Sequence, residues 1–169
     1  MTMAISGATV KIKSLEENKQ VAFEWLEAFA QCDVKRLKAI SGDDFKYYLG
    51  GELPPSGIIP GKEFFAMLQE AAQPILHPIT IRVGAVTAEE NRVCIEGESE
   101  AELANGNKYN NWYHFLFIVD DGRVSGVKEY ADSLHVAQVL FGATTGLPAR
   151  ARASVLGPVT RTIVTHVEG

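Results

Sequence analysis

The feature that most constrains the fold is a set of three apolar runs between Arg92 and Phe141, separated by two short turns. Asn105-Gly106 marks the first turn and Asp121-Gly122 the second. Both dipeptides tolerate the positive φ that tight hairpin turns require. The pattern therefore predicts an antiparallel meander of three long strands, followed by a short helix that Asp132 or Ser133 can cap. One face of such a sheet has to be covered by other parts of the chain.

The segments before the meander are expected to supply that cover. Ser14 and Glu17 have the spacing of a capping box. Apolar side chains then recur at helical spacing and form one helix face, made by Val21, Trp25, Ala28, Phe29 and Cys32. Further along, the sequence predicts a short helix after Asp33, a strand over 45–49, a helix over 61–72 and a strand over 79–87. Seven glycines and prolines in residues 50–61 predict a long loop of the kind that often forms a lid or rim.

Length and composition limit the class of protein. The 169 residues suffice for one domain with an appendage, and we expect a domain over 1–142 and a C-terminal extension over 143–169. Residues 1–142 carry 13 Lys and Arg against 20 Asp and Glu, and this acidic balance argues against nucleic-acid binding. Neither a signal peptide nor a membrane-length apolar run is evident. Cys32 and Cys94 lie in apolar contexts, as expected of reduced thiols in a cytoplasmic protein.

The C-terminal extension holds an alternating run, Val159 to Val167, with the composition of a strand. The meander offers it no obvious partner. Three interpretations stay open: an arm on a neighbouring subunit, an additional edge strand, or a disordered tail.

The order helix, helix, strand, helix, then a long curved antiparallel sheet resembles the α+β cone of the nuclear-transport-factor-2-like (NTF2-like) superfamily. The resemblance is closest to its SnoaL-like polyketide cyclase and ketosteroid-isomerase-related group. Three segments carry it: Gly106 to Asn110, the Asp121-Gly122 turn, and the strand ending Lys128 to Asp132. It covers about residues 14 to 142 and implies a cone wrapped around three N-terminal helices. The fold hosts isomerases, cyclases, dehydratases, epoxide hydrolases and binding proteins, so it does not define a reaction.

Glu129 is the strongest candidate for chemistry. Side chains alternate along a strand, so Val127, Glu129 and Ala131 share one face. An acid between small apolar neighbours has its pKa raised by burial, which suits general acid–base catalysis. The resemblance adds that phenazine-biosynthesis and limonene-epoxide-hydrolase-like relatives place a catalytic acid at the matching position. The alternative is a surface glutamate paired with a lysine.

An acidic face is predicted on the strand over 93–103, formed by Glu96, Glu98, Glu100 and Glu102. Four neighbouring carboxylates cannot all be buried and ionised. Either the whole face is solvated, or the sheet curls so that Glu98 points into the mouth of a pocket. The epoxide hydrolases place an Arg and an Asp two residues apart where this chain has Glu96 and Glu98, so their charge relay is incomplete here.

Both faces of the strand over 111–119 are largely apolar, with Trp112, His114, Leu116 and Ile118 on one of them. This predicts that one face packs on the helices and the other on a second copy, in a homodimer. Tyr113 is either a core tyrosine with a satisfied hydroxyl or a donor to a developing oxyanion, and Tyr48 is a second candidate for that donor. Asp132 is favoured as a helix cap.

Three hypotheses about function follow. The first is an acid–base enzyme without metal or cofactor, of isomerase, cyclase or dehydratase type, acting on a small hydrophobic carbonyl or polycyclic compound. Glu129 would move the proton, Tyr48 or Tyr113 would hold the oxyanion, and Glu98 would lie at the mouth. The expected substrate contacts are Trp25, Phe29, Phe65, Asn111, Phe115 and Asp132. The second hypothesis is a non-catalytic binder of a hydrophobic ligand, and the third is a dimeric assembly module with a vestigial pocket.

Overall fold

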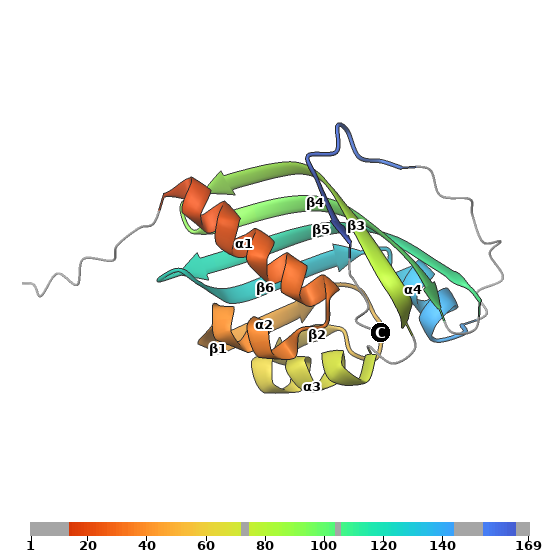
Figure 1. Ribbon diagram of the computed structural model, residues 1–169. Coiled ribbons are helices and arrows are strands. Elements are labelled where there is room, and N and C mark those ends of the chain that lie inside the picture. The colour runs from red at the N-terminus through yellow and green to blue at the C-terminus, as the bar shows by residue number, and fades with distance from the viewer. Residues whose placement is uncertain (1–13, 72–74, 104–105, 144–153, 165–169) are drawn as a thin grey trace, which may run out of the picture.

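The computed structural model describes residues 14–71, 75–103, 106–143 and 154–164, with the side chains of 71 and 75–78 left out (Figure 1). Within these ranges the helices are α1 Leu15–Ala30, α2 Val34–Ile40, α3 Gly61–Ala71 and α4 Ser133–Leu140. The strands are β1 Ser41–Leu49, β2 Gly57–Pro60, β3 Ile75–Glu89, β4 Arg92–Leu103, β5 Lys108–Asp120, β6 Arg123–Ala131 and β7 Arg161–Val164. They form one sheet in the order β2-β1-β6-β5-β4-β3-β7. The α+β class is confirmed.

The predicted meander is confirmed in β4, β5 and β6, which pair antiparallel in sequence order. Asp121 and Gly122 take φ of 50° and 77°, the left-handed conformation that this turn requires. Gly106 in the first turn has φ of 81°, whereas Asn105 lies outside the described residues. The local turn chemistry therefore sets the register of the central strands.

The first half of the sheet departs from the sequence expectation in two ways. β1 pairs parallel with β6, so the sheet is mixed rather than wholly antiparallel. β2 folds back on β1 as an antiparallel strand within the segment expected to be a loop. The β1–β6 pairing joins residues about eighty positions apart, which local turn signals do not encode. The β1–β2 pairing is local, but it lies within a segment whose glycines and prolines favour a loop.

Helix α1 lies across one face of the sheet, here named the inner face because it carries Phe115 and Phe117 (Figure 1). The capping box is confirmed, since the Ser14 hydroxyl accepts from the Glu17 N–H at 3.2 Å and the Glu17 carboxylate accepts from the Ser14 N–H at 2.7 Å. Trp25 is fully buried at the centre of the core, with five aromatic rings around it: Phe29, Phe45, Tyr47, Phe64 and Phe117.

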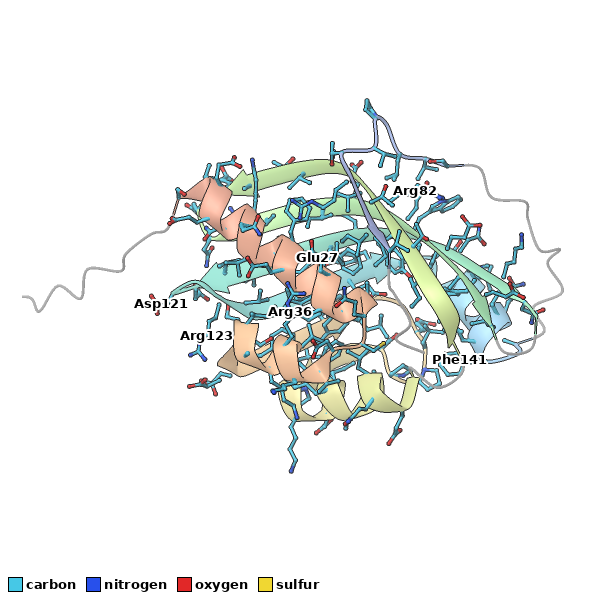
Figure 2. All side chains as sticks on the ribbon, viewed as in Figure 1. Glu27, Arg36, Arg82, Asp121, Arg123 and Phe141 are labelled. Atoms are coloured by element: carbon cyan, nitrogen blue, oxygen red, sulfur yellow. The ribbon has the colours of Figure 1, made fainter. Side chains whose placement is uncertain are left out.

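The C-terminal segment provides an additional edge strand, one of the three interpretations open from sequence. β7 pairs antiparallel with β3 and buries Ile163 in the main core. Arg161 also ties this segment to α1, because its guanidinium lies 3.4 Å from Glu27, a carboxylate that Arg36 of α2 reaches at 3.4 Å as well (Figure 2). Residues 165–167 of the predicted strand lie outside the described residues.

Candidate functional site

A cavity of about 190 Å³ opens at the end of the inner face where β6 stops and α4 begins. Its walls come from α1, β1, α3, β5 and β6, through Phe29, Tyr47, Leu49, Phe64, Met67, Leu68, Tyr109, Glu129 and Ala131. Its rim is formed by the loop after β1 and by α4, through Gly50, Leu53, Pro55, Ser133, Val136, Leu140 and Phe141. Phe141, labelled at the end of α4 in Figure 2, is 57% exposed. The site is therefore an apolar pocket with few polar groups.

Glu129 places its carboxyl in this cavity and is only 8% exposed. The Tyr47 hydroxyl donates to Oε2, and Tyr47 is the only hydrogen-bond partner of the Glu129 carboxyl in the described part of the chain. Burial raises the pKa of Glu129 from 4.5 to about 7, while the hydrogen bond from Tyr47 pulls that pKa down. The surface-glutamate alternative is excluded, because this carboxyl is buried and has no lysine partner among the described residues.

Tyr47 is the tyrosine that β1 directs into the cavity. Its burial, followed by the neighbouring Glu129, raises the pKa of its phenol well above the ordinary value, so the phenol stays protonated and donates. Tyr48 points to the opposite, outer face, where its ring lies 5.7 Å from that of Tyr130. The expectation that Tyr48 faces the pocket is therefore wrong. The alternation of Phe45 and Tyr47 on the buried side of β1 was the signal available in the sequence.

A network of hydroxyl groups lies beside the cavity. The hydroxyls of Tyr109 and Tyr113 are 2.8 Å apart, and Ser99 Oγ lies 3.1 Å from the Tyr113 hydroxyl. Tyr109 lines the cavity, whereas Tyr113 does not. Tyr113 thus matches the interpretation of a core tyrosine with a satisfied hydroxyl, and burial raises its pKa well above the ordinary value. The network holds the Tyr109 ring in the cavity wall.

Asn111 and Asp132 serve the backbone around the pocket. The buried Asn111 amide donates to the Tyr109 hydroxyl at 3.1 Å, and its Oδ1 accepts from the N–H of Asp132 at 3.2 Å. Asp132 caps α4 by accepting from the His135 N–H at 3.0 Å. Neither residue lines the cavity, so the structure brings them beside the candidate site rather than into it.

Glu98 lies on the face opposite the cavity. Glu98 of β4 pairs with Trp112 of β5. Phe115 lies on the other face of β5 and pairs with Glu129 of β6, which lines the cavity. The Glu98 carboxylate accepts from the N–H of Val155 at 2.6 Å and lies 3.7 Å from Arg82. The expectation that Glu98 points into a pocket mouth is wrong, because the C-terminal segment buries it on the outer face. Glu96, Glu100 and Glu102 on the same face are exposed, as the solvated alternative predicts.

The predicted aromatic walls are only partly those of the cavity. Phe29 lines it, while Trp25, Phe65 and Phe115 are buried behind the lining side chains. Phe64 takes the place expected for Phe65, and its ring stacks on Tyr47 with centroids 4.1 Å apart. Two adjacent phenylalanines on α3 cannot be told apart by helical spacing alone, since both fall on the core side.

The described residues also show two further properties. No group of three or more His, Cys, Asp and Glu side chains in these ranges is placed to hold a metal ion. None of the described helices combines the length and apolar composition that crossing a membrane requires.

The sequence profile of the SnoaL-like domain matches residues 22–127, and this chain belongs to that family. Solved structures show the same NTF2-like fold. An NTF2-like protein from Burkholderia xenovorans LB400 is 24% identical over 75% of this chain and 97% of its own, with a TM-score of 0.62. The BvnE pinacolase from Penicillium brevicompactum is 16% identical over 78% of this chain and 94% of its own, with a TM-score of 0.66. An epoxide hydrolase from M. tuberculosis, described as LEH-like, is 20% identical over 76% of this chain and 92% of its own, with a TM-score of 0.59. No curated protein sequence matches the chain.

Proposed function

We propose that this protein is an acid–base enzyme that acts on a small apolar carbonyl compound, with Glu129 moving the proton. The observation that carries this proposal is one carboxyl group buried in an apolar cavity. Its Oε2 is held by Tyr47, and Oε1 has no protein partner in the described ranges. A desolvated carboxyl oxygen without a protein partner is a natural contact for a ligand atom.

The protonation state of Glu129 suits both halves of a proton transfer. Because its pKa is raised to about 7, the carboxylate and the carboxylic acid are both populated at neutral pH. The carboxylate can remove a proton from the carbon next to a carbonyl, and the resulting acid can return it elsewhere. A base positioned in this way typically contributes about 100- to 10,000-fold to the rate.

Tyr47 is the residue that we propose to hold the developing oxyanion, in place of Tyr48 or Tyr113. Its hydroxyl donates to Glu129 while that group is ionised. Once Glu129 has taken the substrate proton, its carboxyl becomes a weaker acceptor, and the Tyr47 hydroxyl can donate to the enolate oxygen instead. The negative charge then moves from Glu129 to the ligand, and the Tyr47 hydroxyl changes its acceptor from Glu129 to the ligand oxygen.

The test uses a simple probe of proton abstraction. Cyclohexanone in D₂O exchanges the hydrogens next to its carbonyl, and ¹H NMR follows that loss. We expect the wild-type protein to accelerate exchange over buffer, and Glu129→Gln, which keeps the shape, to lose about 100- to 10,000-fold of that acceleration. Exchange at the buffer rate, with cyclohexanone shown to be bound, would remove the proposal.

A second candidate function is non-catalytic binding of an apolar ligand. The observation in its favour is the cavity itself, whose lining is mainly aliphatic and aromatic whatever the state of Glu129. On this alternative, Glu129→Gln would leave ligand affinity unchanged and neither protein would catalyse exchange.

A further inference from the structure

We propose that the ligand of this cavity is an uncharged compound built on a single ring and bearing one oxygen that hydrogen-bonds to Glu129 Oε1. Two-ring compounds bind more weakly, and carboxylates are excluded. As the substrate class of an enzyme, this inference rests on the proposed function. As a ligand class, it depends only on the size and charge of the cavity.

The first argument is size. An engineered protein cavity of about 150 Å³ binds benzene. The present cavity of about 190 Å³ is only modestly larger, so it accommodates one ring with a short substituent. A fused second ring would have to displace lining side chains or extend past the rim, where it makes fewer contacts.

The second argument is that one side of the cavity cannot yield. Tyr47 and Phe64 stack with their ring centroids 4.1 Å apart, and Phe29 lies 6.3 Å from each of them. Behind these rings lies the fully buried Trp25, whose indole N–H donates to Ser41 Oγ at 3.0 Å. Close-packed interiors resist such displacement. The limit on ligand size is therefore adjustable at Met67 and Leu68, one turn beyond Phe64 on α3, and at the rim formed by α4 and the loop after β1.

The third argument is charge. Among the described lining residues there is no Lys, Arg or His, and the ionisable groups are Glu129 and the phenols of Tyr47 and Tyr109. A carboxylate or phosphate on the ligand would be desolvated without a cation to balance it and would face the Glu129 carboxyl. Burying an unpaired charge in this way is strongly unfavourable.

The fourth argument concerns the polar contact. Oε1 is the oxygen of Glu129 that no described residue hydrogen-bonds. When Glu129 is protonated, it can donate to a carbonyl oxygen, and when it is ionised it cannot. The groups around it are the phenols of Tyr47, Tyr109 and Tyr113, and burial raises the pKa of Tyr47 and of Tyr113 above the ordinary value. A carbonyl ligand should therefore bind more tightly below the pKa of Glu129 than above it, in a resting complex in which its oxygen accepts from Oε1. The reactive complex is a different one, in which Glu129 is ionised and the ligand oxygen faces the Tyr47 hydroxyl.

The experiment measures the affinity of three probes by titration calorimetry at pH 6 and pH 8. Cyclohexanone should bind, and about tenfold more tightly at pH 6, because the protonated fraction of a group with a pKa of about 7 falls by that factor. 2-Decalone should bind at least about tenfold more weakly than cyclohexanone. Cyclohexanecarboxylate should show no binding at pH 8.

Variants make the size argument specific. Leu68→Ala enlarges the cavity and should restore 2-decalone binding, while Leu116→Ala, a half-buried leucine on the outer face, should not. If Leu68→Ala does not fold, Met67→Ala is used in its place. Glu129→Gln should bind cyclohexanone with no change between pH 6 and pH 8.

Several results would overturn the inference. These are equal binding of 2-decalone and cyclohexanone by the wild type, binding of the carboxylate, or binding of no probe. The proposed function fails separately: selective binding without deuterium exchange removes the enzyme and keeps the ligand class. Deuterium exchange by a protein that binds 2-decalone and cyclohexanone equally would remove the ligand class and keep the enzyme.

Discussion

Tyr47 donates its phenolic hydrogen bond to the carboxyl of Glu129 across the parallel strands β1 and β6. In the register of this pair, Glu129 lies opposite Leu49, so the two partners are two residues apart on the same face. Because the hydroxyl comes from a different strand, the position of Glu129 in the cavity depends on the parallel pairing itself.

The first prediction concerns stability against pH. Folding raises the pKa of Glu129 from 4.5 to about 7, so the folded protein binds this proton more tightly than the unfolded chain. Its contribution is fully present below about pH 4.5 and is lost as the pH rises to about 7, on the order of 3 kcal/mol in total. Glu129→Gln lacks this loss. Urea unfolding at pH 5 and pH 8 should therefore show the variant gaining on the wild type by roughly 2.5 kcal/mol, since a little of the total is already lost at pH 5. An unchanged difference would contradict the burial of a titrating carboxyl.

The second prediction concerns the Tyr47 hydroxyl. Since its hydrogen bond lowers the pKa of Glu129, Tyr47→Phe should move that pKa above its value of about 7. Carboxyl ¹³C NMR titration measures the shift directly. Tyr48→Phe on the outer face is the matched control and should leave the titration of Glu129 as it was. Equal effects from the two variants would mean that the parity of β1 is misassigned.

The third prediction concerns the centre of the core. Trp25 is fully buried, and its indole N–H is bonded to Ser41 at 3.0 Å. Trp25→Ala should lower the free energy of unfolding by roughly 3–5 kcal/mol, because it removes a large buried side chain and leaves a hole among aromatic rings. Chemical denaturation is the measurement. A change below about 1 kcal/mol would be the value for a surface position.

The fourth prediction concerns the C-terminal strand. Ile163→Ala should cost about 2–5 kcal/mol, since Ile163 is only 5% exposed and belongs to the main core. The neighbouring Val164→Ala is the control, because Val164 is 39% exposed and should change stability by less than about 0.5 kcal/mol. The Val155 amide donates to Glu98, and its hydrogen exchange should accelerate in Ile163→Ala but not in Val164→Ala.

The fifth prediction concerns assembly. The outer face presents half-buried apolar side chains at Trp112, Leu116 and Ile118, and we expect a homodimer through it. Sedimentation at micromolar concentration should give the dimer mass, and Leu116→Glu should give the monomer. A stable wild-type monomer under those conditions would end this prediction.

The parts of the fold that could be predicted are those that local chemistry specifies. Asp121-Gly122 and the alternation along β6 are encoded within a few residues, so the meander and the inward side of Glu129 follow from the sequence. The pairing of β1 with β6 is not encoded locally. The alternation of Phe45 and Tyr47 indicates that Tyr47 is on the buried side of β1, but only the pairing of β1 with β6 shows that it meets Glu129.

The position of Glu98 shows the same limit in another form. Its buried carboxylate is stabilised on the outer face by Arg82 and by the N–H of Val155, 57 residues later in the chain. A pattern of four alternating glutamates contains no information about that cover. Strand periodicity therefore identifies which side chains share a face, but not which of them another segment buries.

The pairing of β7 with β3 has a consequence for biosynthesis. About eighty residues separate the partners Ile81 and Ile163, and every other strand of the sheet precedes β7 in the chain. During translation, the Thr80–Val83 edge of β3 must therefore stay unpaired by β7 until residues 161–164 have left the ribosome. A nascent chain at that stage presents an open, apolar strand edge of the kind that associates with other chains. The pairing of β7 is thus what covers this edge of β3.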